Sequence, residues 1–175
     1  IRIDNCLVSG INDTKNVTKQ FGFIHAINKG SNVWNDVSVT NSTFYEFYIS
    51  PGVFGAPTAN VPIAAGNKVV ISNCTFYNWG SNKDGKNTYR AVGNFSKLTA
   101  PLNLSVNNCV FGSSESKVLD AGGINLDSKG NYCTSDFEKM SDAGLTLISL
   151  DTDDASLFRN IEENDFTVID AESVI

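Results

Sequence analysis

The chain has 175 residues, 41% of them hydrophobic, and a formal net charge of −6 at pH 7. This length fits a single domain over residues 1–175 with a sizeable core, and its apolar stretches are too short to predict a membrane span. The acidic charge, without a basic cluster to neutralise phosphates, argues against a nucleic-acid partner.

Residues 1–8 contain the first copy of a pattern that recurs along the chain. The pattern reads apolar, any, apolar, any, Asn, small, any, apolar, and further copies occupy residues 37–44, 69–76 and 104–111. A weaker fifth copy covers residues 124–133, with Asn131 in the place of the Asn. The first four copies follow one another every 32–36 residues, a period typical of stacked repeat proteins.

Each copy predicts two short strands joined by a corner. Apolar and polar residues alternate, which indicates a strand with one buried face. Asn adopts the left-handed αL conformation more readily than other non-glycine residues, so it can turn the strand sharply. We therefore predict an all-β fold, a single-stranded right-handed parallel β-helix (solenoid) of about five coils with long loops. A leucine-rich solenoid would need a shorter period, and a β-sandwich would show hairpin signals every 8–12 residues.

Stacking would place equivalent residues of neighbouring coils about 4.8 Å apart. Three ladders are predicted: Asn5, Asn41, Asn73 and Asn108 at the corner; Cys6, Ser42, Cys74 and Cys109 facing inward; and Val8, Phe44, Phe76 and Phe111 in the core. Burying each large apolar member stabilises the fold by about 1.5–3 kcal/mol. Stacked cysteines have parallel Cβ directions that disfavour disulfides, so we interpret them as small buried side chains.

Gly, Pro and polar residues mark the segments between the copies. In chain order they predict a loop over 9–23, a strand over 23–27, a turn over 30–36, protruding excursions over 45–68 and 79–87, a strand over 89–95 and a loop over 112–123. After the fifth copy, we expect a short helical turn over 136–142, a strand over 145–150 and a tail from residue 156.

The repeats resemble those of pectate-lyase-like right-handed β-helix domains. The copies read IRIDNCLV, VSVTNSTF, VVISNCTFYNWG and LSVNNCVF, and the more specific segments are GNYCTSDF and ASLFRNIEENDFTV. Nearly the whole chain is similar to β-helix domains of secreted polysaccharide-degrading proteins of Bacteroidota. The resemblance implies an extracellular or cell-surface module that is covalently linked to a catalytic domain. A non-catalytic branch of this architecture binds carbohydrate, so the resemblance also implies a polysaccharide ligand. Because the chain begins inside a repeat, we expect it to be a segment of a larger multimodular protein.

A catalytic set is not evident in the repeats. A polysaccharide lyase needs a Lys or Arg base and usually Ca²⁺ held by Asp and Glu. The group formed by Lys83, Lys86 and Arg90 near Asp84 is interpreted as a solvated loop of mixed charge.

A metal site is not predicted with any strength either. The chain has one His, His25, which lies in a predicted strand and is interpreted as structural. Asp151, Asp153 and Asp154 could hold Ca²⁺, but they lie in the terminal segment, and a solvated turn is the favoured interpretation. We therefore expect no cofactor, with Ca²⁺ as the one candidate.

Aromatic residues give the clearer functional signal, because an exposed Tyr or Trp offers a flat surface to the apolar face of a sugar ring. Tyr45 and Tyr77 are predicted to point outward from adjacent coils as a stacked pair. The predicted carbohydrate-binding residues are Trp79, Tyr77, Tyr45, Tyr48, Tyr89, Arg90 and Lys86. Under the competing interpretation, Trp79 and Phe47 cap the core and the Tyr pair packs beneath residues 45–68.

The favoured hypothesis is a non-catalytic module that recognises a plant or algal polysaccharide, of xylan or pectin type, through aromatics on one face. The alternatives are a polysaccharide lyase or glycosidase of the pectate-lyase-like type, and a structural spacer domain.

Overall fold

The computed structural model describes residues 1–12, 22–25, 34–49, 51–55, 63–64, 66–80, 89–98, 100–120, 122–138 and 144–169, with 11, 12 and 25 described by their backbone alone. Strands dominate these ranges, where the one α-helix is α1 (Asp154–Leu157). None of the helical structure in these ranges is long and apolar enough to cross a membrane. The prediction of an all-β protein is confirmed.

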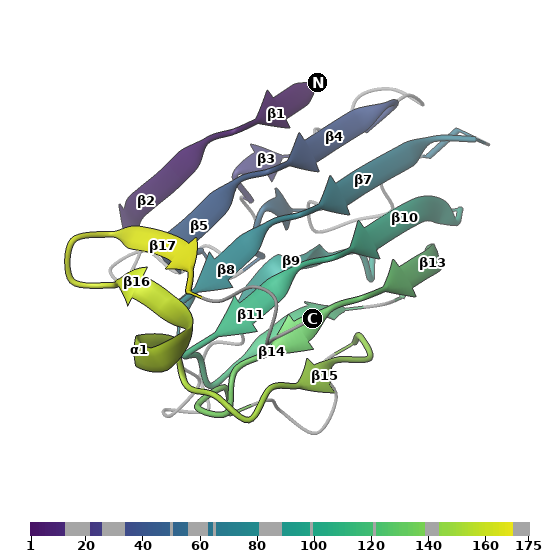
Figure 1. The fold of residues 1–175 in the computed structure, drawn as a ribbon. Coiled ribbons are helices and arrows are strands. Elements are labelled where there is room, and N and C mark those ends of the chain that lie inside the picture. Colours follow the sequence, from purple (N-terminus) through teal and green to yellow (C-terminus); the bar gives the residue numbers. More distant parts are fainter. Residues whose placement is uncertain are drawn as a thin grey trace.

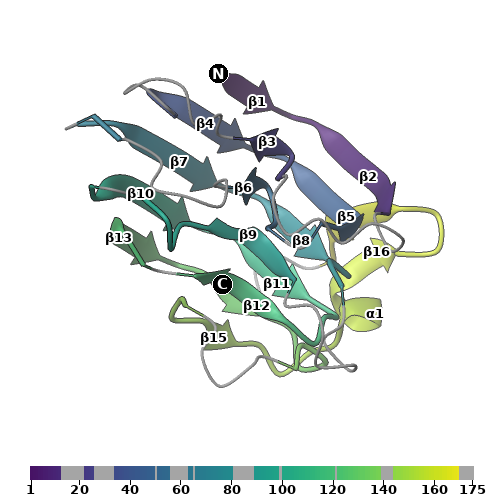
Figure 2. The same cartoon turned by 180° about the vertical axis from the view of Figure 1, so that it is seen from behind.

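Three parallel sheets make up most of the structure (Figures 1 and 2). In spatial order, sheet A contains β1 (Arg2–Asp4), β4 (Val37–Thr40), β7 (Lys68–Ser72), β10 (Leu102–Asn107) and β13 (Ile124–Lys129). Sheet B contains β15 (Ile148–Ser149), β14 (Tyr132–Cys133), β11 (Val110–Gly112), β8 (Thr75–Tyr77), β5 (Thr43–Tyr48) and β2 (Leu7–Asn12). Sheet C contains β12 (Lys117–Asp120), β9 (Arg90–Asn94), β6 (Phe54–Gly55) and β3 (Ile24–His25).

The chain enters sheet A, then sheet B, then sheet C, and repeats this cycle from β1 to β12. Strands with the same place in successive repeats are therefore hydrogen-bonded neighbours. Val37 of β4 pairs with Val69 of β7, and Leu104 of β10 pairs with both Val69 and Leu126 of β13. The predicted alignment of repeats two to four is confirmed by the Val37–Val69 and Val69–Leu104 pairs.

The Asn corner between sheets A and B has the backbone conformation that the sequence predicts. Asn5, Asn41, Asn73 and Asn108 have φ angles of 54°, 50°, 53° and 55°. The amide nitrogen Nδ2 of Asn73 donates to Oδ1 of Asn41 at 3.3 Å. The corner therefore combines a left-handed backbone with a side-chain bond between neighbouring repeats.

The fifth copy is shifted by one residue from its predicted position. Asn107 pairs with Lys129, so the next residues, Asn108 and Gly130, occupy equivalent corner positions. Gly130 has a φ of 60°. Asn131 takes the inward place after Cys109, where its Oδ1 accepts from the Cys109 amide and its Nδ2 donates to the Val106 carbonyl. Glycine adopts a positive φ at least as readily as Asn, so the corner did not need Asn.

The space between the three sheets is filled by one apolar cluster. Phe76 stacks between Phe44 and Phe111 with ring centroids 5.2 and 5.1 Å apart, so the predicted Phe ladder is confirmed. None of the four cysteines forms a disulfide. Cys74 and Cys109 are buried as predicted, whereas Cys6 is exposed because β1 and β2 form the edges of their sheets.

Several predictions for the connecting segments are wrong. The loop expected from residue 9 starts later, because β2 continues to Asn12. The excursion over 45–68 contains β6, and the loop over 112–123 contains β12; both strands belong to sheet C. These strands are short and lack clear alternation, since both residues of β6 and the two central residues of β12 are buried.

The C-terminal segment leaves the parallel sheets and folds back onto sheet B (Figure 1). It consists of α1 and an antiparallel hairpin of β16 (Phe158–Asn160) and β17 (Asp165–Val168). Asp153 caps α1 by accepting from the Ser156 amide at 2.8 Å. Leu157 and Phe158 are buried together with Leu150, so this segment has a small apolar cluster of its own.

Candidate functional site

The outer face of sheet B carries the predicted Tyr pair. Tyr45 of β5 and Tyr77 of β8 are direct partners in the register, and both side chains are half-buried. Their predicted pairing across adjacent repeats is therefore confirmed.

The C-terminal hairpin covers this pair. The Phe166 ring of β17 packs against Tyr45 and Tyr77 with centroid distances of 5.1 and 5.3 Å. The pair thus lies under the protein's own tail and is not the open platform that the sequence suggested. Residues 50, 56–62 and 65 of the segment predicted to cover it lie outside the described residues. Burial, followed by the nearby Asp154 and Asp136 carboxylates, raises the pKa of Tyr77.

Trp79 is a core residue, so its predicted role as an exposed sugar platform is wrong. Its side chain is fully buried, its ring packs against Phe111 and Phe137, and its Nε1 donates to the Lys117 carbonyl at 2.9 Å. The cause is Asn78, whose φ of 49° makes a second left-handed corner and turns the next residue inward.

A left-handed corner at the equivalent position also occurs one repeat earlier. Glu46 has a φ of 49° and Phe47 after it is fully buried. The alternation of inward and outward side chains that starts at Tyr45 and Tyr77 therefore breaks at Glu46 and Asn78. The interpretation of Trp79 and Phe47 as matching core residues is confirmed.

The structure places three of the four remaining predicted site residues. Tyr89 is buried, with its ring against Gly80. Arg90 forms a largely buried ion pair with Asp120. Asp120 also forms an ion pair with Lys117, with 3.2 Å between Oδ1 and Nζ. Tyr48 is half-buried, and Lys86 lies outside the described residues.

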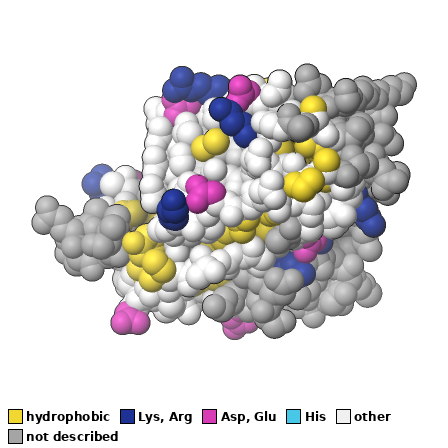
Figure 3. Space-filling model, turned by 90° about the vertical axis from the view of Figure 1, so that its right-hand side faces the viewer, with side chains coloured by type: hydrophobic (Ala, Val, Ile, Leu, Met, Phe, Trp, Pro, Cys, Tyr) yellow, Lys and Arg dark blue, Asp and Glu magenta, His cyan; other side chains and the backbone are white. Residues whose placement is uncertain are grey.

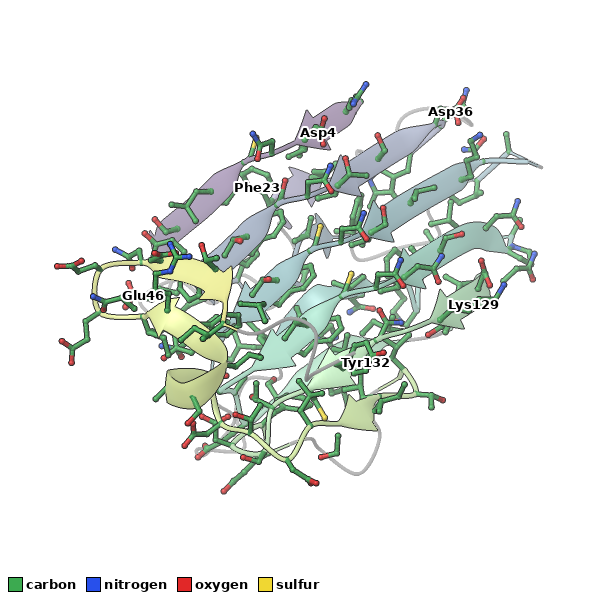
Figure 4. The ribbon with its side chains drawn as sticks, viewed as in Figure 1. Asp4, Phe23, Asp36, Glu46, Lys129 and Tyr132 are labelled. Atoms are coloured by element: carbon green, nitrogen blue, oxygen red, sulfur yellow. The ribbon has the colours of Figure 1, made fainter. Side chains whose placement is uncertain are left out.

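A hollow of about 400 Å³ lies on sheet B beside the C-terminal segment. It is lined by Asn73, Asn108, Val110, Tyr132, Leu150, Leu157 and Val168. Val110 and Tyr132 are register partners on β11 and β14, and the labelled Tyr132 marks the place in Figure 4. Two ladder amides form one side, and the C-terminal residues Leu157 and Val168 form the other. We name this the amide–tyrosine hollow.

The sequence prediction missed Tyr132 as a site residue. Placing Asn131 at the fifth corner left Tyr132 one position out of register with Val110. Taking Gly130 as the corner would have aligned Tyr132 with Val110 and Thr75, both on the outer face of sheet B.

A second hollow, of about 280 Å³, lies near the ends of β8 and β11. It is lined by Asn78, Gly80, Ser113, Ser114, Glu115, Asp136 and Glu138. Three of these residues are carboxylates, and none of the described lining residues is Lys or Arg. This acidic hollow is electrostatically unsuited to an anionic ligand.

Asp154 of α1 lies close to the acidic hollow. Only 3% of its surface is exposed, and burial, followed by the nearby Asp136 carboxylate, raises its pKa to about 7. The side chains of Thr134 and Ser113 are near enough to favour its charged form, yet its carboxyl oxygens have no partner with hydrogen-bond geometry among the described residues.

The Asp151, Asp153 and Asp154 group does not form a metal site. Asp153 is committed to capping α1, Asp151 is exposed and Asp154 is buried. Among the residues that the structure describes, no set of three or more His, Cys, Asp or Glu side chains is arranged to hold a metal ion.

Comparisons with protein-family models, with curated proteins and with solved structures found no match for this chain. Its function is therefore inferred from the two hollows and the covered Tyr pair.

Proposed function

We propose that the chain is a right-handed parallel β-helix of about five coils that acts as a non-catalytic carbohydrate-binding module. The cyclic order of the three parallel sheets and the stacked ladders support this architecture. The module binds its polysaccharide outside the cell or at the cell surface, and it is covalently linked to a catalytic domain that acts on the same polymer.

The observation that carries the proposal is the amide–tyrosine hollow. Its volume of about 400 Å³ lies within the usual range of about 300–1,000 Å³ for small-ligand pockets. Tyr132 offers a ring to the apolar face of a sugar, and Asn73 and Asn108 offer amide donors and acceptors to its hydroxyls. The aliphatic residues around them exclude water from these contacts.

The charge distribution favours a neutral polymer. The seven described residues around the hollow carry no charge, the nearby acidic hollow repels anions, and the chain has a net charge of −6. On the face shown in Figure 3, the described acidic and basic side chains are intermixed and do not form a broad basic area. Xylan and mixed-linkage glucan are therefore expected to bind better than pectin or alginate.

Native gel electrophoresis with each of these four polymers in the gel tests the proposal. We expect xylan to retard the wild-type protein most and Tyr132→Ala to abolish the retardation. Tyr132→Phe keeps the ring and should keep most of the affinity. Losing one neutral hydrogen bond in Asn108→Gly should weaken binding about fivefold, since such a bond contributes about 1 kcal/mol.

Asn5→Gly is the matched control for Asn108→Gly. Both positions have a positive φ that glycine accepts, but Asn5 does not line the hollow and lies two repeats away from Asn73. Equal loss in the two variants, or no retardation of the wild type by any polymer, would refute the binding site and favour a spacer domain. Release of unsaturated or reducing sugars by the wild type would instead show a lyase or glycosidase.

A further inference from the structure

Two buried side chains near the C-terminal segment have polar atoms without partners. Asp154 is 3% exposed and Thr134 is 1% exposed. Neither carboxyl oxygen of Asp154, nor the Thr134 hydroxyl, has a hydrogen-bond partner among the described residues. Burying such groups unpaired is costly, and most for a charged carboxylate. Such retained groups call for a partner beyond the described residues, such as an ordered water or an ion.

The unpartnered oxygens converge on one place. Asp154 belongs to α1, whereas Thr134 follows β14. A Cβ atom added to Gly112 would overlap Asp154 Oδ1 and lie 3.2 Å from Thr134 Oγ1. Both oxygens therefore face the surface of Gly112, where the absent side chain leaves them close together.

A second carboxylate reaches the same place. Asp136 Oδ2 accepts from the Asp154 backbone amide at 3.4 Å, and its charge is close enough to act on the Asp154 carboxyl. No described Lys or Arg forms an ion pair with Asp136 or Asp154. Among the described residues, the two carboxylates thus meet without a cation.

We propose that Asp154, Asp136 and Thr134 bind a divalent cation, Ca²⁺, beside Gly112. The donors are all oxygen atoms, which hard cations prefer, and they include neither His nor Cys. Ca²⁺ accepts an irregular mixture of carboxylate, hydroxyl and water ligands, whereas Mg²⁺ demands near-octahedral geometry. Two carboxylates match the double charge, and water completes the coordination.

The bound ion joins the C-terminal segment to the parallel sheets. Asp154 lies in the helix that precedes the hairpin, and Thr134 and Asp136 lie in the turn after β14. The ion therefore fastens the segment that covers the Tyr pair and forms one side of the amide–tyrosine hollow. This inference does not depend on carbohydrate binding.

The test measures Ca²⁺ directly. After treatment with a chelator and its removal, isothermal titration with CaCl₂ at neutral pH should show one site, with MgCl₂ binding at least tenfold more weakly. Thermal unfolding should occur at higher temperature with Ca²⁺ than with chelator, because the ion binds the folded state. Asp154→Asn and Asp136→Asn should each lower the Ca²⁺ affinity at least tenfold.

Asp153→Asn provides the matched control. Asn caps a helix about as well as Asp, so this variant removes a neighbouring charge while keeping α1, and its Ca²⁺ affinity should stay within about twofold of wild type. Without Ca²⁺, Asp154→Asn should be at least as stable as wild type, which separates loss of the site from loss of the fold. Absence of Ca²⁺ binding by the wild type, or equal affinity in wild type and Asp154→Asn, would overturn the proposal.

Discussion

Gly112→Ala is the sharpest test of how the C-terminal segment sits on sheet B. The added methyl group would overlap Asp154 Oδ1 and approach its Cγ to 3.1 Å. Asp154 is almost fully buried and cannot swing into solvent without moving α1. Overpacking of this kind costs about 1–3 kcal/mol, and at this chain length each kcal/mol lowers the unfolding temperature by about 2–4 °C.

The assay is thermal unfolding with chelator present, so that metal binding does not contribute. Four proteins are compared: wild type, Gly112→Ala, Asp154→Ala and the double variant. Removing the Asp154 carboxyl leaves Thr134 Oγ1, at 3.2 Å, as the nearest contact of the added methyl group. The cost of Gly112→Ala should therefore fall below about 1 kcal/mol in the Asp154→Ala background.

An equal cost of Gly112→Ala in both backgrounds would refute the reasoning, because it would show that the two residues do not touch. A cost near zero in the wild-type background would do the same. In either case α1 would not lie where the structure places it.

Three other changes give separate expectations. Trp79→Ala should destabilise the fold by about 3–5 kcal/mol in chemical unfolding, since it empties a fully buried site, whereas Trp79→Phe should cost much less. Asn73→Ala should cost about 1 kcal/mol more than Asn73→Gly, because residue 73 has a φ of 53° that glycine accepts without strain. Burial, followed by the charge of Glu46, raises the pKa of Tyr48 above 10.0. The contribution of the neutral Tyr48 hydroxyl to folding stability is therefore fully present below pH 10.0 and is lost as the pH rises through the folded-state pKa. Tyr48→Phe should therefore reduce the loss of stability at alkaline pH.

These expectations have clear counter-results. Unchanged stability in Trp79→Ala would place the indole outside the core. Equal stability of the Ala and Gly variants at position 73 would remove the backbone argument for the Asn corner. An identical alkaline profile in wild type and Tyr48→Phe would show that the Tyr48 hydroxyl ionises alike in folded and unfolded chains.

The sequence by itself determined the repeating part of the fold. Each repeat buries the same small set of residues against its neighbours, so a local pattern is enough to fix the Phe ladder and the alignment of sheets A and B. The Asn corner was predictable for the same reason, because a positive φ is a property of one residue and its own backbone. Even the shift at Gly130 follows this rule, since glycine meets the requirement without Asn.

Only the tertiary structure decided which surface is free. The left-handed conformation at Asn78 turned Trp79 into the core, and alternation along the strand gave no sign of that corner. Phe166 of the hairpin packs against Tyr45 and Tyr77, which lie far from it in the sequence. The same packing of the C-terminal segment on sheet B brings Asp154 next to Asp136 and Gly112. Such contacts depend on how a non-repeating tail packs against a finished stack, and a repeat pattern carries no information about that packing.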